Sequence, residues 1–263
     1  MKPVVFKTEK LCRTYGFGAH KTWAVKTADL VIEEGNIYSI VGESGSGKTT
    51  IAKMLLGLLK PSSGKISFYG DAIALKNHKE CVTYWNHVQA VFQDPFSSFN
   101  QFYKVQDLLM NCIKMKFRKI SSEEAYVIMS NACSYVNLDL KELWNKHPFE
   151  LSGGQMQRLM IARIFIIKPK VLIADEPTSM IDACSRSMIL DMLLKLKSDI
   201  QMTIIFITHD IGLAYYVSDY LYIMEKGEVV EEGDARSVIS NPKARYTKQL
   251  LSDVPTIHKE WLT

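Results

Sequence analysis

The sequence lacks the features that mark secreted, disulfide-stabilised or membrane-spanning proteins. Its five cysteines are scattered and form no CxxC pair, so neither a disulfide framework nor a zinc site is expected. No run approaches the roughly 18 apolar residues that a membrane-spanning helix requires. Residues 1–7 lack the apolar core of a signal peptide. Contact with a membrane is therefore expected only through a partner.

Internal repeats, low-complexity linkers and a strong charge imbalance are also missing. The 32 basic and 28 acidic residues leave a net charge of +4, which is too mild to indicate nucleic acid as a partner. The densest basic segment, 114–119, is expected to be a solvated face where a helical insertion begins. With 263 residues and 47% apolar content, the chain can bury a large core in one domain with a helical insertion.

A phosphate-binding loop is the first motif present. Residues 42–49 read GESGSGKT, after a strand-like apolar run at 37–41 and before an amphipathic helix expected at 50–59. Glycines allow a sharp turn, and successive N–H groups at a helix N-terminus bind phosphate. Lys48 is expected to reach the β- and γ-phosphates, and the Thr49 hydroxyl to ligate Mg²⁺. The residues expected to bind the nucleotide here are Gly42, Ser44, Gly45, Gly47, Lys48, Thr49 and Thr50.

An acidic strand end is the second motif. Four apolar residues at 171–174 predict a buried parallel strand that ends in Asp175 and Glu176. Asp175 suits the outer shell of Mg²⁺, and Glu176 is placed to polarise the attacking water. Seen alone, such a pair can be a solvated strand end. The phosphate loop upstream favours ATP hydrolysis instead.

The segment 151–158, LSGGQMQR, narrows the kind of ATPase. Together with the two preceding motifs it makes the chain resemble the nucleotide-binding subunit of ABC transporters over nearly its whole length. The resemblance implies that Ser152, Gly153, Gly154 and Gln155 contact the γ-phosphate of ATP held by the opposing subunit. A hydroxyl and free N–H groups at a helix start suit that contact, although Ser-Gly-Gly is also an ordinary helix cap.

The resemblance assigns further residues by their order along the chain. Gln93, after a strand expected at 88–92, matches the glutamine that senses Mg²⁺ and the γ-phosphate, and it joins Thr49 and Asp175 in the expected metal set. Asp182 matches the aspartate that bridges the two subunits, with Met180-Ile181 where the family more often has Ala-Leu. His209, after a strand expected at 203–208, matches the histidine that holds the γ-phosphate.

An aromatic ring upstream of the phosphate loop is expected to stack on adenine. Tyr15 occupies the family position, and stacking is worth about 1–3 kcal/mol per base. Phe17 and Trp23 are neighbouring rings that offer alternatives. The choice of Tyr15 rests on position rather than on chemistry.

Three features favour an importer. The chain has one ATPase set without a transmembrane part, the segment 147–150 resembles the Pro-x-Glu entry of bacterial importers, and the coiled-coil insertion of chromosome and repair proteins is absent. The tail at 241–255 resembles the peptide/nickel importer subfamily through Asn-Pro, Tyr-Thr-x-x-Leu-Leu and Val-Pro. Ala244-Arg245 stand where that subfamily usually has His-Pro, and Gln101 stands where Pro is common. An ordinary turn and amphipathic helix would explain the tail equally well.

These expectations combine into an α/β P-loop NTPase of the ABC ATPase kind with an N-terminal antiparallel β-subdomain and a helical insertion. A single domain at 1–263 is expected, with the nucleotide-binding core and β-subdomain at about 1–92 and 161–240. The helical subdomain with the signature is expected at about 93–160, and a C-terminal tail at about 241–263.

Two such chains would sandwich two Mg-ATP molecules. The expected partners are two transmembrane permeases, a second ATPase chain (a different one or a second copy), and indirectly an extracytoplasmic solute-binding protein. They would meet at the cytoplasmic face of the cell membrane, without nucleic acid. The cargo is expected to be a peptide, a nickel chelate or a related solute. The alternative is a soluble non-transport ABC ATPase acting on nucleic acid or ribosomes.

Aromatic side chains crowd the segment after Gln93, where the family forms a groove for a short helix of the membrane subunit. They are Phe96, Phe99, Phe102 and Tyr103. Phe99 is expected to be an exposed docking residue, because aromatic rings dominate interface energies. Packing of these rings into the helical insertion is the alternative.

Overall fold

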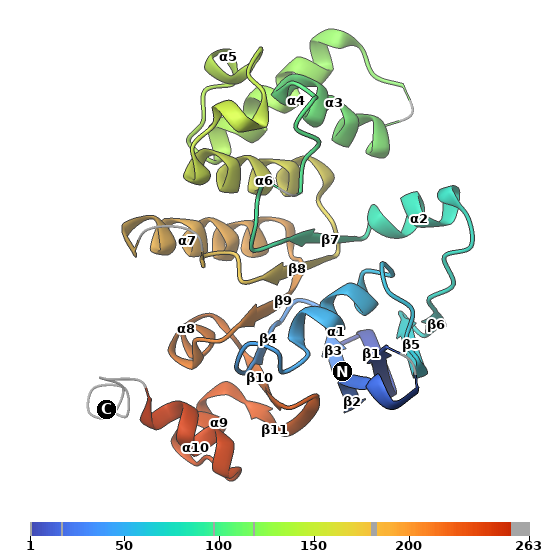
Figure 1. Cartoon of the computed structure of the whole chain (residues 1–263). Coiled ribbons are helices and arrows are strands. Elements are labelled where there is room, and N and C mark those ends of the chain that lie inside the picture. Colours follow the sequence, from blue (N-terminus) through green and yellow to red (C-terminus); the bar gives the residue numbers. More distant parts are fainter. Residues whose placement is uncertain (1, 17, 97, 118, 180–182, 254–263) are drawn as a thin grey trace. The chain divides into compact units, whose positions relative to one another are not determined.

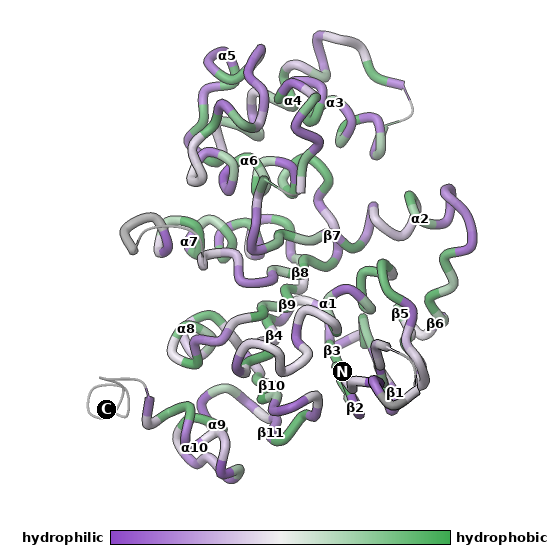
Figure 2. The backbone as a smooth tube through the Cα atoms, in the orientation of Figure 1, coloured by the Kyte–Doolittle hydropathy of each residue, from purple (hydrophilic) through white to green (hydrophobic). Residues whose placement is uncertain are grey.

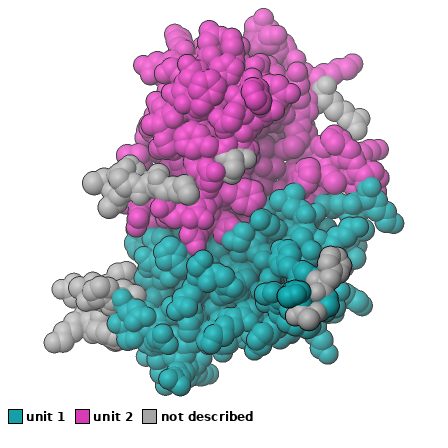
Figure 3. All heavy atoms as spheres, viewed as in Figure 1, with its two compact units in different colours: residues 1–76, 203–263 teal, residues 77–202 magenta. Residues whose placement is uncertain are grey.

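A computed structural model describes residues 2–16, 18–96, 98–117, 119–179 and 183–253. Its contacts group into two compact units, drawn in teal and magenta in Figure 3. The core unit comprises residues 1–76 and 203–263, and the helical unit comprises residues 77–202. These limits differ from the functional division predicted above, which stays a prediction.

An antiparallel sheet forms the N-terminal part of the core unit, as predicted (Figure 1). Its long strand β1 pairs antiparallel with β2, β3 and β5, and β5 pairs with β6. The strands are β1 (Val4–Tyr15), β2 (Thr22–Ala28), β3 (Val31–Glu33), β5 (Ser63–Phe68) and β6 (Asp71–Ala72).

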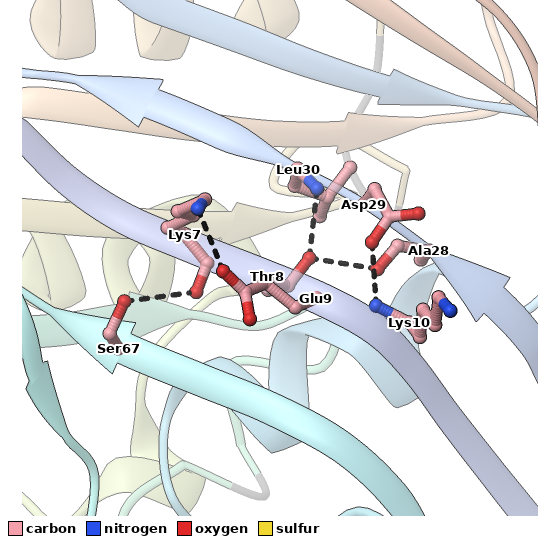
Figure 4. A network of polar contacts seen from close by, with 8 residues as sticks. All are labelled: Lys7, Thr8, Glu9, Lys10, Ala28, Asp29, Leu30 and Ser67. Carbon is pink, nitrogen blue, oxygen red and sulfur yellow. Dashed lines mark hydrogen bonds and ion pairs between the residues drawn. The ribbon is translucent and has the colours of Figure 1, made fainter.

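A buried hydroxyl ties β1 to the turn between β2 and β3 (Figure 4). Thr8 Oγ1 donates to the Ala28 carbonyl at 2.9 Å and accepts from the Leu30 amide at 2.8 Å. The Asp29 carboxylate in the same turn accepts from the amide of Lys10. Buried polar groups are stable only when hydrogen-bonded, so these contacts fix the turn against β1.

A mainly parallel set of strands forms the other part of the core unit. Strand β4 (Ile37–Val41) pairs in parallel with β9 (Thr203–Thr208) on one side and β10 (Tyr220–Glu225) on the other. Strand β11 (Glu228–Asp234) returns antiparallel to β10. All residues of β4 and β9 are buried, and Figure 2 draws β9 mainly in the hydrophobic colour. Burial on both faces explains why these strands are near-continuous apolar runs.

Four α-helices accompany these strands in the described part of the core unit. They are α1 (Lys48–Leu55), α8 (Ile211–Val217), α9 (Ala235–Ser240) and α10 (Arg245–Ser252), with a short 3₁₀ turn at Gly18–His20. Helix α1 was predicted at 50–59 but begins at Lys48 and ends at Leu55. Gly57 follows with φ of +71°, a left-handed conformation that no α-helix continues through.

The helical unit contains two parallel strands and a cluster of helices. Strand β7 (Val88–Val91) pairs with β8 (Val171–Asp175), and helices α3 and α4 both contact α6. The helices are α2 (His78–Trp85), α3 (Val105–Lys116), α4 (Ser122–Tyr135), α5 (Leu140–Leu143), α6 (Gly153–Ile167) and α7 (Ala183–Ile200), with a 3₁₀ turn at Pro148–Glu150. The basic segment 114–119 was expected where the insertion begins. Lys114 and Lys116 instead lie in the last turn of α3, where cations interact favourably with the helix dipole.

Candidate nucleotide site

The turn between β4 and α1 has the conformation of a phosphate loop, and two of its glycines are required by it. Gly47 is the N-cap of α1 with φ of +107°, and a Cβ there would lie 2.3 Å from the Ala24 carbonyl oxygen. A Cβ at Gly42 would lie 2.2 Å from the Met224 carbonyl oxygen. Any other residue at either position would force the backbone apart. The loop therefore needs glycine where the motif has it.

The Lys48 ammonium lies against the carbonyl groups of the same loop. It is buried, and its Nζ donates to the carbonyls of Gly42 at 2.7 Å and Glu43 at 2.8 Å. Ser46 Oγ is also buried and has no hydrogen-bond partner within the described ranges. A buried cation, an unsatisfied hydroxyl and the first N–H groups of a helix fit an anionic phosphate chain. The loop thus has the donor set for nucleotide phosphates.

Two distant segments hold the loop from outside. The Gly227 amide, in the turn between β10 and β11, donates to the Ser46 carbonyl at 3.0 Å. The Glu43 amide donates to the Tyr246 hydroxyl of α10 at 2.9 Å. Neither contact is predicted from the sequence, because no local pattern connects the tail or this turn with the loop.

His209 follows the strand next to the one that enters the phosphate loop. Val41 and Thr208 are register partners at the ends of β4 and β9, so the loop and His209 leave the sheet at the same edge. His209 is exposed, and Asp210 after it caps α8 by accepting from the Leu213 amide at 2.9 Å. This edge, at the carboxyl ends of parallel strands, is where such sheets bind ligands.

Two exposed aromatic rings lie at the ends of β1 and β2. Tyr15 is 43% exposed with the Arg13 guanidinium 5.0 Å from its ring centroid, and Trp23 is 49% exposed with Lys21 Nζ at 5.0 Å. Tyr15 pairs with Thr22 and Trp23 with Thr14, so the two rings point to opposite faces of the β1–β2 ribbon. A single adenine can stack on only one of them. Phe17 lies outside the described residues.

In the helical unit, Gln93 and the acidic pair follow neighbouring parallel strands. Val91 and Ala174 are register partners, so Gln93, Asp175 and Glu176 emerge at one edge of the β7–β8 pair. Gln93 is exposed and Asp175 is buried.

Glu176 has φ of +47°, an unusual conformation for a residue other than glycine. Its carbonyl accepts from the amide and the hydroxyl of Ser179 at 3.2 and 3.0 Å. Left-handed residues held by their surroundings concentrate at functional sites.

The signature segment begins helix α6 with a capping box. The Ser152 hydroxyl accepts from the Gln155 amide at 3.2 Å, and the Gln155 side chain accepts from the Ser152 amide at 3.0 Å. The helix cap therefore exists and its first turn remains accessible, while contact with the nucleotide of an opposing subunit stays a prediction. Within the described part of the chain, nothing lies within 4 Å of a Cβ built at Gly153 or Gly154. The protein's own packing does not require glycine at either position.

A buried glutamine connects the signature helix to the acidic loop. Gln157 is 2% exposed, and its amide group donates to the Pro177 carbonyl, just after Glu176. The sequence analysis assigned no role to Gln157. A polar residue on the otherwise apolar inner face of α6 was the signal available, since a buried amide must find a partner.

The predicted exposure of the aromatic side chains after Gln93 differs from the observed exposure at one residue. Phe99 is only 9% exposed, and the Arg163 guanidinium of α6 lies 5.6 Å from its ring centroid. The expectation of an exposed Phe99 is therefore wrong, because its ring packs within the helical unit. Phe102 and Tyr103 are the exposed rings, at 89% and 48%.

The segment 96–101 is closed by a side chain that departs from the family pattern. Gln101 Nε2 donates to the Phe96 carbonyl at 2.5 Å and to the Phe99 carbonyl at 3.3 Å. The proline that the resemblance leads one to expect at this position would have no side-chain donor. In this chain the amide group of Gln101 therefore performs the closure.

The predicted site residues fall into two sets. The phosphate loop, Tyr15 and His209 belong to the core unit, while Gln93, Asp175, Glu176 and the signature belong to the helical unit. Asp182 lies outside the described residues. Across the described part of the chain, no helix is both long and apolar enough to cross a lipid bilayer.

Comparison with known proteins agrees with this arrangement. Residues 25–179 match the ABC transporter family. The chain is 36% identical over 234 residues to the oligopeptide transport ATP-binding protein OppF of Lactococcus lactis, covering 89% of this chain and 73% of the relative. It is 36% identical over 243 residues to the oligopeptide transport ATP-binding protein AmiF of Streptococcus pneumoniae, covering 92% and 79%.

Among solved structures, a dimeric ATP-binding cassette in a post-hydrolysis state bound to ADP and Pi superposes with a TM-score of 0.79. The two chains are 28% identical, and the match covers 88% of this chain and 99% of the other. The α/β fold predicted from the sequence is therefore confirmed. The chain belongs to the ABC transporter family and is one of its ATPases.

Proposed function

We propose that this chain is the ATP-hydrolysing subunit of a peptide importer, acting at the cytoplasmic face of the cell membrane. Two relatives that cover most of its length are oligopeptide transport ATP-binding proteins. Their names favour transport over action on nucleic acid or ribosomes. Peptide cargo is favoured over nickel chelates for the same reason.

The phosphate loop supports the proposal most directly, because it holds a buried lysine, a buried hydroxyl without a partner in the described part of the chain, and the N-terminus of α1. Gly42, Ser44, Gly45, Gly47, Lys48, Thr49 and Thr50 bind the nucleotide phosphates, and Tyr15 stacks on adenine. The Lys48 ammonium, which lies against the loop carbonyls, transfers its hydrogen bonds to the β- and γ-phosphates. Thr49, Gln93 and Asp175 would hold Mg²⁺, which would supply positive charge to the phosphates.

Hydrolysis is assigned to three side chains. Glu176, held in its left-handed conformation at the end of β8, orients and polarises the attacking water. His209 and Gln93 contact the γ-phosphate and respond to its loss. These roles account for exposed polar residues at the carboxyl ends of buried strands, where ligands of such sheets bind.

A second ATPase subunit completes the site. Ser152, Gly153, Gly154 and Gln155 contact the nucleotide of the opposing subunit, and Asp182 bridges the two subunits. The open space around Gly153 and Gly154 supports this role. Side chains are absent there although the chain's own packing would admit them, and close approach of another molecule requires such an absence.

Two transmembrane permeases and an extracytoplasmic solute-binding protein are the other proposed partners. Phe102 and Tyr103 are the exposed aromatic rings available for a permease helix. The second ATPase is either a different chain or a second copy.

Reconstitution tests the proposal. The chain is co-expressed with the permeases and the binding protein encoded beside its gene, and the complex is placed in proteoliposomes. Peptide-loaded binding protein is expected to stimulate ATP hydrolysis and peptide uptake, and Lys48→Ala is expected to abolish both. Stimulation by a nickel chelate but not by peptides would contradict the cargo. ATPase activity that responds to RNA or ribosomes and not to the permeases would contradict transport.

A further inference from the structure

The Gly42–Glu43 peptide unit of the phosphate loop is held from both of its polar ends. Its carbonyl oxygen, on Gly42, accepts from Lys48 Nζ at 2.7 Å. Its amide, on Glu43, donates to the Tyr246 hydroxyl at 2.9 Å. Because a peptide unit is planar and rigid, these two hydrogen bonds together fix the orientation of the first turn of the loop.

The hydrogen bonds from Lys48 and to Tyr246 differ in whether they persist when a nucleotide binds. Lys48 is the residue that must donate to the phosphates when a nucleotide binds, so its hydrogen bonds to the loop carbonyls are given up at that moment. Tyr246 makes no such transfer, because it is a buried residue of α10, 7% exposed, that is not among the residues expected to contact the nucleotide. After Lys48 turns to the phosphates, Tyr246 remains as the anchor of this peptide unit.

Helix α10 is held near the loop by a buried apolar cluster and by a carboxylate that binds the segment ahead of the helix. Tyr246, Leu250 and Leu251 belong to the same buried cluster as Val41, the last residue of β4 before the loop. Ahead of the helix, the Glu231 carboxylate of β11 accepts from the amides of Lys243 at 2.8 Å and Ala244 at 3.0 Å.

The charge of Glu231 favours these contacts. Burial alone would raise the pKa of Glu231, but the nearby polar side chain of Thr247, the hydrogen bonds from the two amides and the charge of Lys243 outweigh it, and the pKa is lowered. A charged carboxylate thus accepts from the amides that lead into the helix.

We propose that Tyr246 is a positioning residue of the phosphate loop, and that the C-terminal helix sets ATP affinity by holding the Gly42–Glu43 peptide for phosphate binding. The tail is then a part of the nucleotide site, reached through the backbone of the loop rather than by contact with the nucleotide. This inference rests on the phosphate-loop roles proposed above.

The test removes one oxygen atom. In Tyr246→Phe the ring and its packing remain, while the Glu43 amide loses its acceptor. Affinity for Mg-ATP, measured by fluorescence titration with a labelled ATP analogue and competition with ATP, is expected to fall about two- to tenfold, the range of one hydrogen bond. The KM for ATP should rise by the same factor, and kcat should change by less than about twofold.

Tyr38→Phe is the matched control. Tyr38 is 4% exposed, and its hydroxyl also accepts one backbone amide, that of Glu33, at 2.9 Å. Both variants lose one buried hydrogen bond, so both should lower the melting temperature by a similar small amount. Only Tyr246→Phe should lose ATP affinity. Equal affinity of the two variants would overturn the inference, because Tyr246 would then act only in packing.

Two further variants separate the possible failures. Lys48→Ala should abolish binding of the ATP analogue; if it binds normally, the phosphate-loop assignment itself fails. If Tyr246→Phe melts well below Tyr38→Phe, Glu231→Gln replaces it, since it keeps the hydroxyl and weakens only the anchoring of α10. An affinity loss of about twofold or more in Glu231→Gln supports the inference, and an unchanged affinity refutes it.

Discussion

Phe99 and Phe102 form a natural matched pair, because they are the same residue type three positions apart and differ in burial. Phe99 is 9% exposed beneath Arg163, whereas Phe102 is 89% exposed. Replacing a buried Phe with Ala costs about 3–5 kcal/mol through lost transfer energy and a residual cavity. The lower end suits Phe99, which lies in a loop rather than in a regular element, and the lost contact with the guanidinium adds about 0.5–1 kcal/mol.

These magnitudes predict different melting behaviour. The combined loss of about 3.5–4 kcal/mol corresponds to a fall of roughly 7–16 °C in Tm for a chain of this size. Phe102→Ala should change stability by less than about 0.5 kcal/mol, which is about 2 °C or less. Differential scanning calorimetry of the purified chain measures both variants against the wild type.

The same pair separates packing from docking. If Phe102 contacts a permease helix, Phe102→Ala should lower the affinity for the permeases about tenfold, as expected for an aromatic interface residue. Less of the permeases should then co-purify with the chain. Phe99→Ala, assayed well below its melting temperature, should still co-purify. The reasoning is refuted if Phe99→Ala melts like the wild type, or if Phe102→Ala melts several degrees lower and still binds the permeases normally.

Four further substitutions, one of them a control, test the nucleotide site. Glu176→Gln should bind Mg-ATP and trap the ATP-bound dimer. It should hydrolyse ATP about 10² to 10⁴-fold more slowly, the range for loss of a general base. Near-normal turnover would show that Glu176 takes no part in the chemistry. Ser152→Arg should spare ATP photo-crosslinking to a single chain but block ATP-dependent dimerisation in size-exclusion chromatography, because it places a large cation where a second subunit must approach. Equal loss of both signals would mean that Ser152 acts within its own subunit. Tyr15→Ala should weaken binding of the adenine nucleotide by about 1–3 kcal/mol, and Trp23→Ala should leave it unchanged; the reverse result would assign the stacking ring to Trp23.

The elements that the sequence predicted correctly are those whose signals are local. Strands β4 and β9 are predicted to the residue, at 37–41 and 203–208, because burial on both faces makes each a near-continuous apolar run. The glycines of the predicted phosphate loop are local signals as well. Glycine is the residue that tolerates the left-handed conformation of Gly47 and the close approach of the Met224 carbonyl to Gly42.

The local pattern did not predict where helix α1 ends or which aromatic side chains after Gln93 are buried. The amphipathic pattern of α1 continues to residue 59, but the backbone at Gly57 ends the helix earlier. Four aromatic rings after Gln93 look alike in the sequence, and packing against α6 decided that Phe99 is buried while Phe102 is exposed. Hydrophobicity alone does not separate them, because a side chain is buried only where another element covers it.

The C-terminal tail shows most clearly which features the sequence indicates and which depend on the tertiary structure. The sequence by itself indicated that the tail at 241–255 can hold an amphipathic helix, since an apolar stripe at helical spacing is a property of the local pattern, and the structure places that helix at Arg245–Ser252. Only the tertiary structure decided that the Tyr246 hydroxyl meets the amide of Glu43, across a separation of 203 residues. A contact of that kind depends on the pairing of β4, β10 and β11 in one sheet, and no pattern within either segment predicts it.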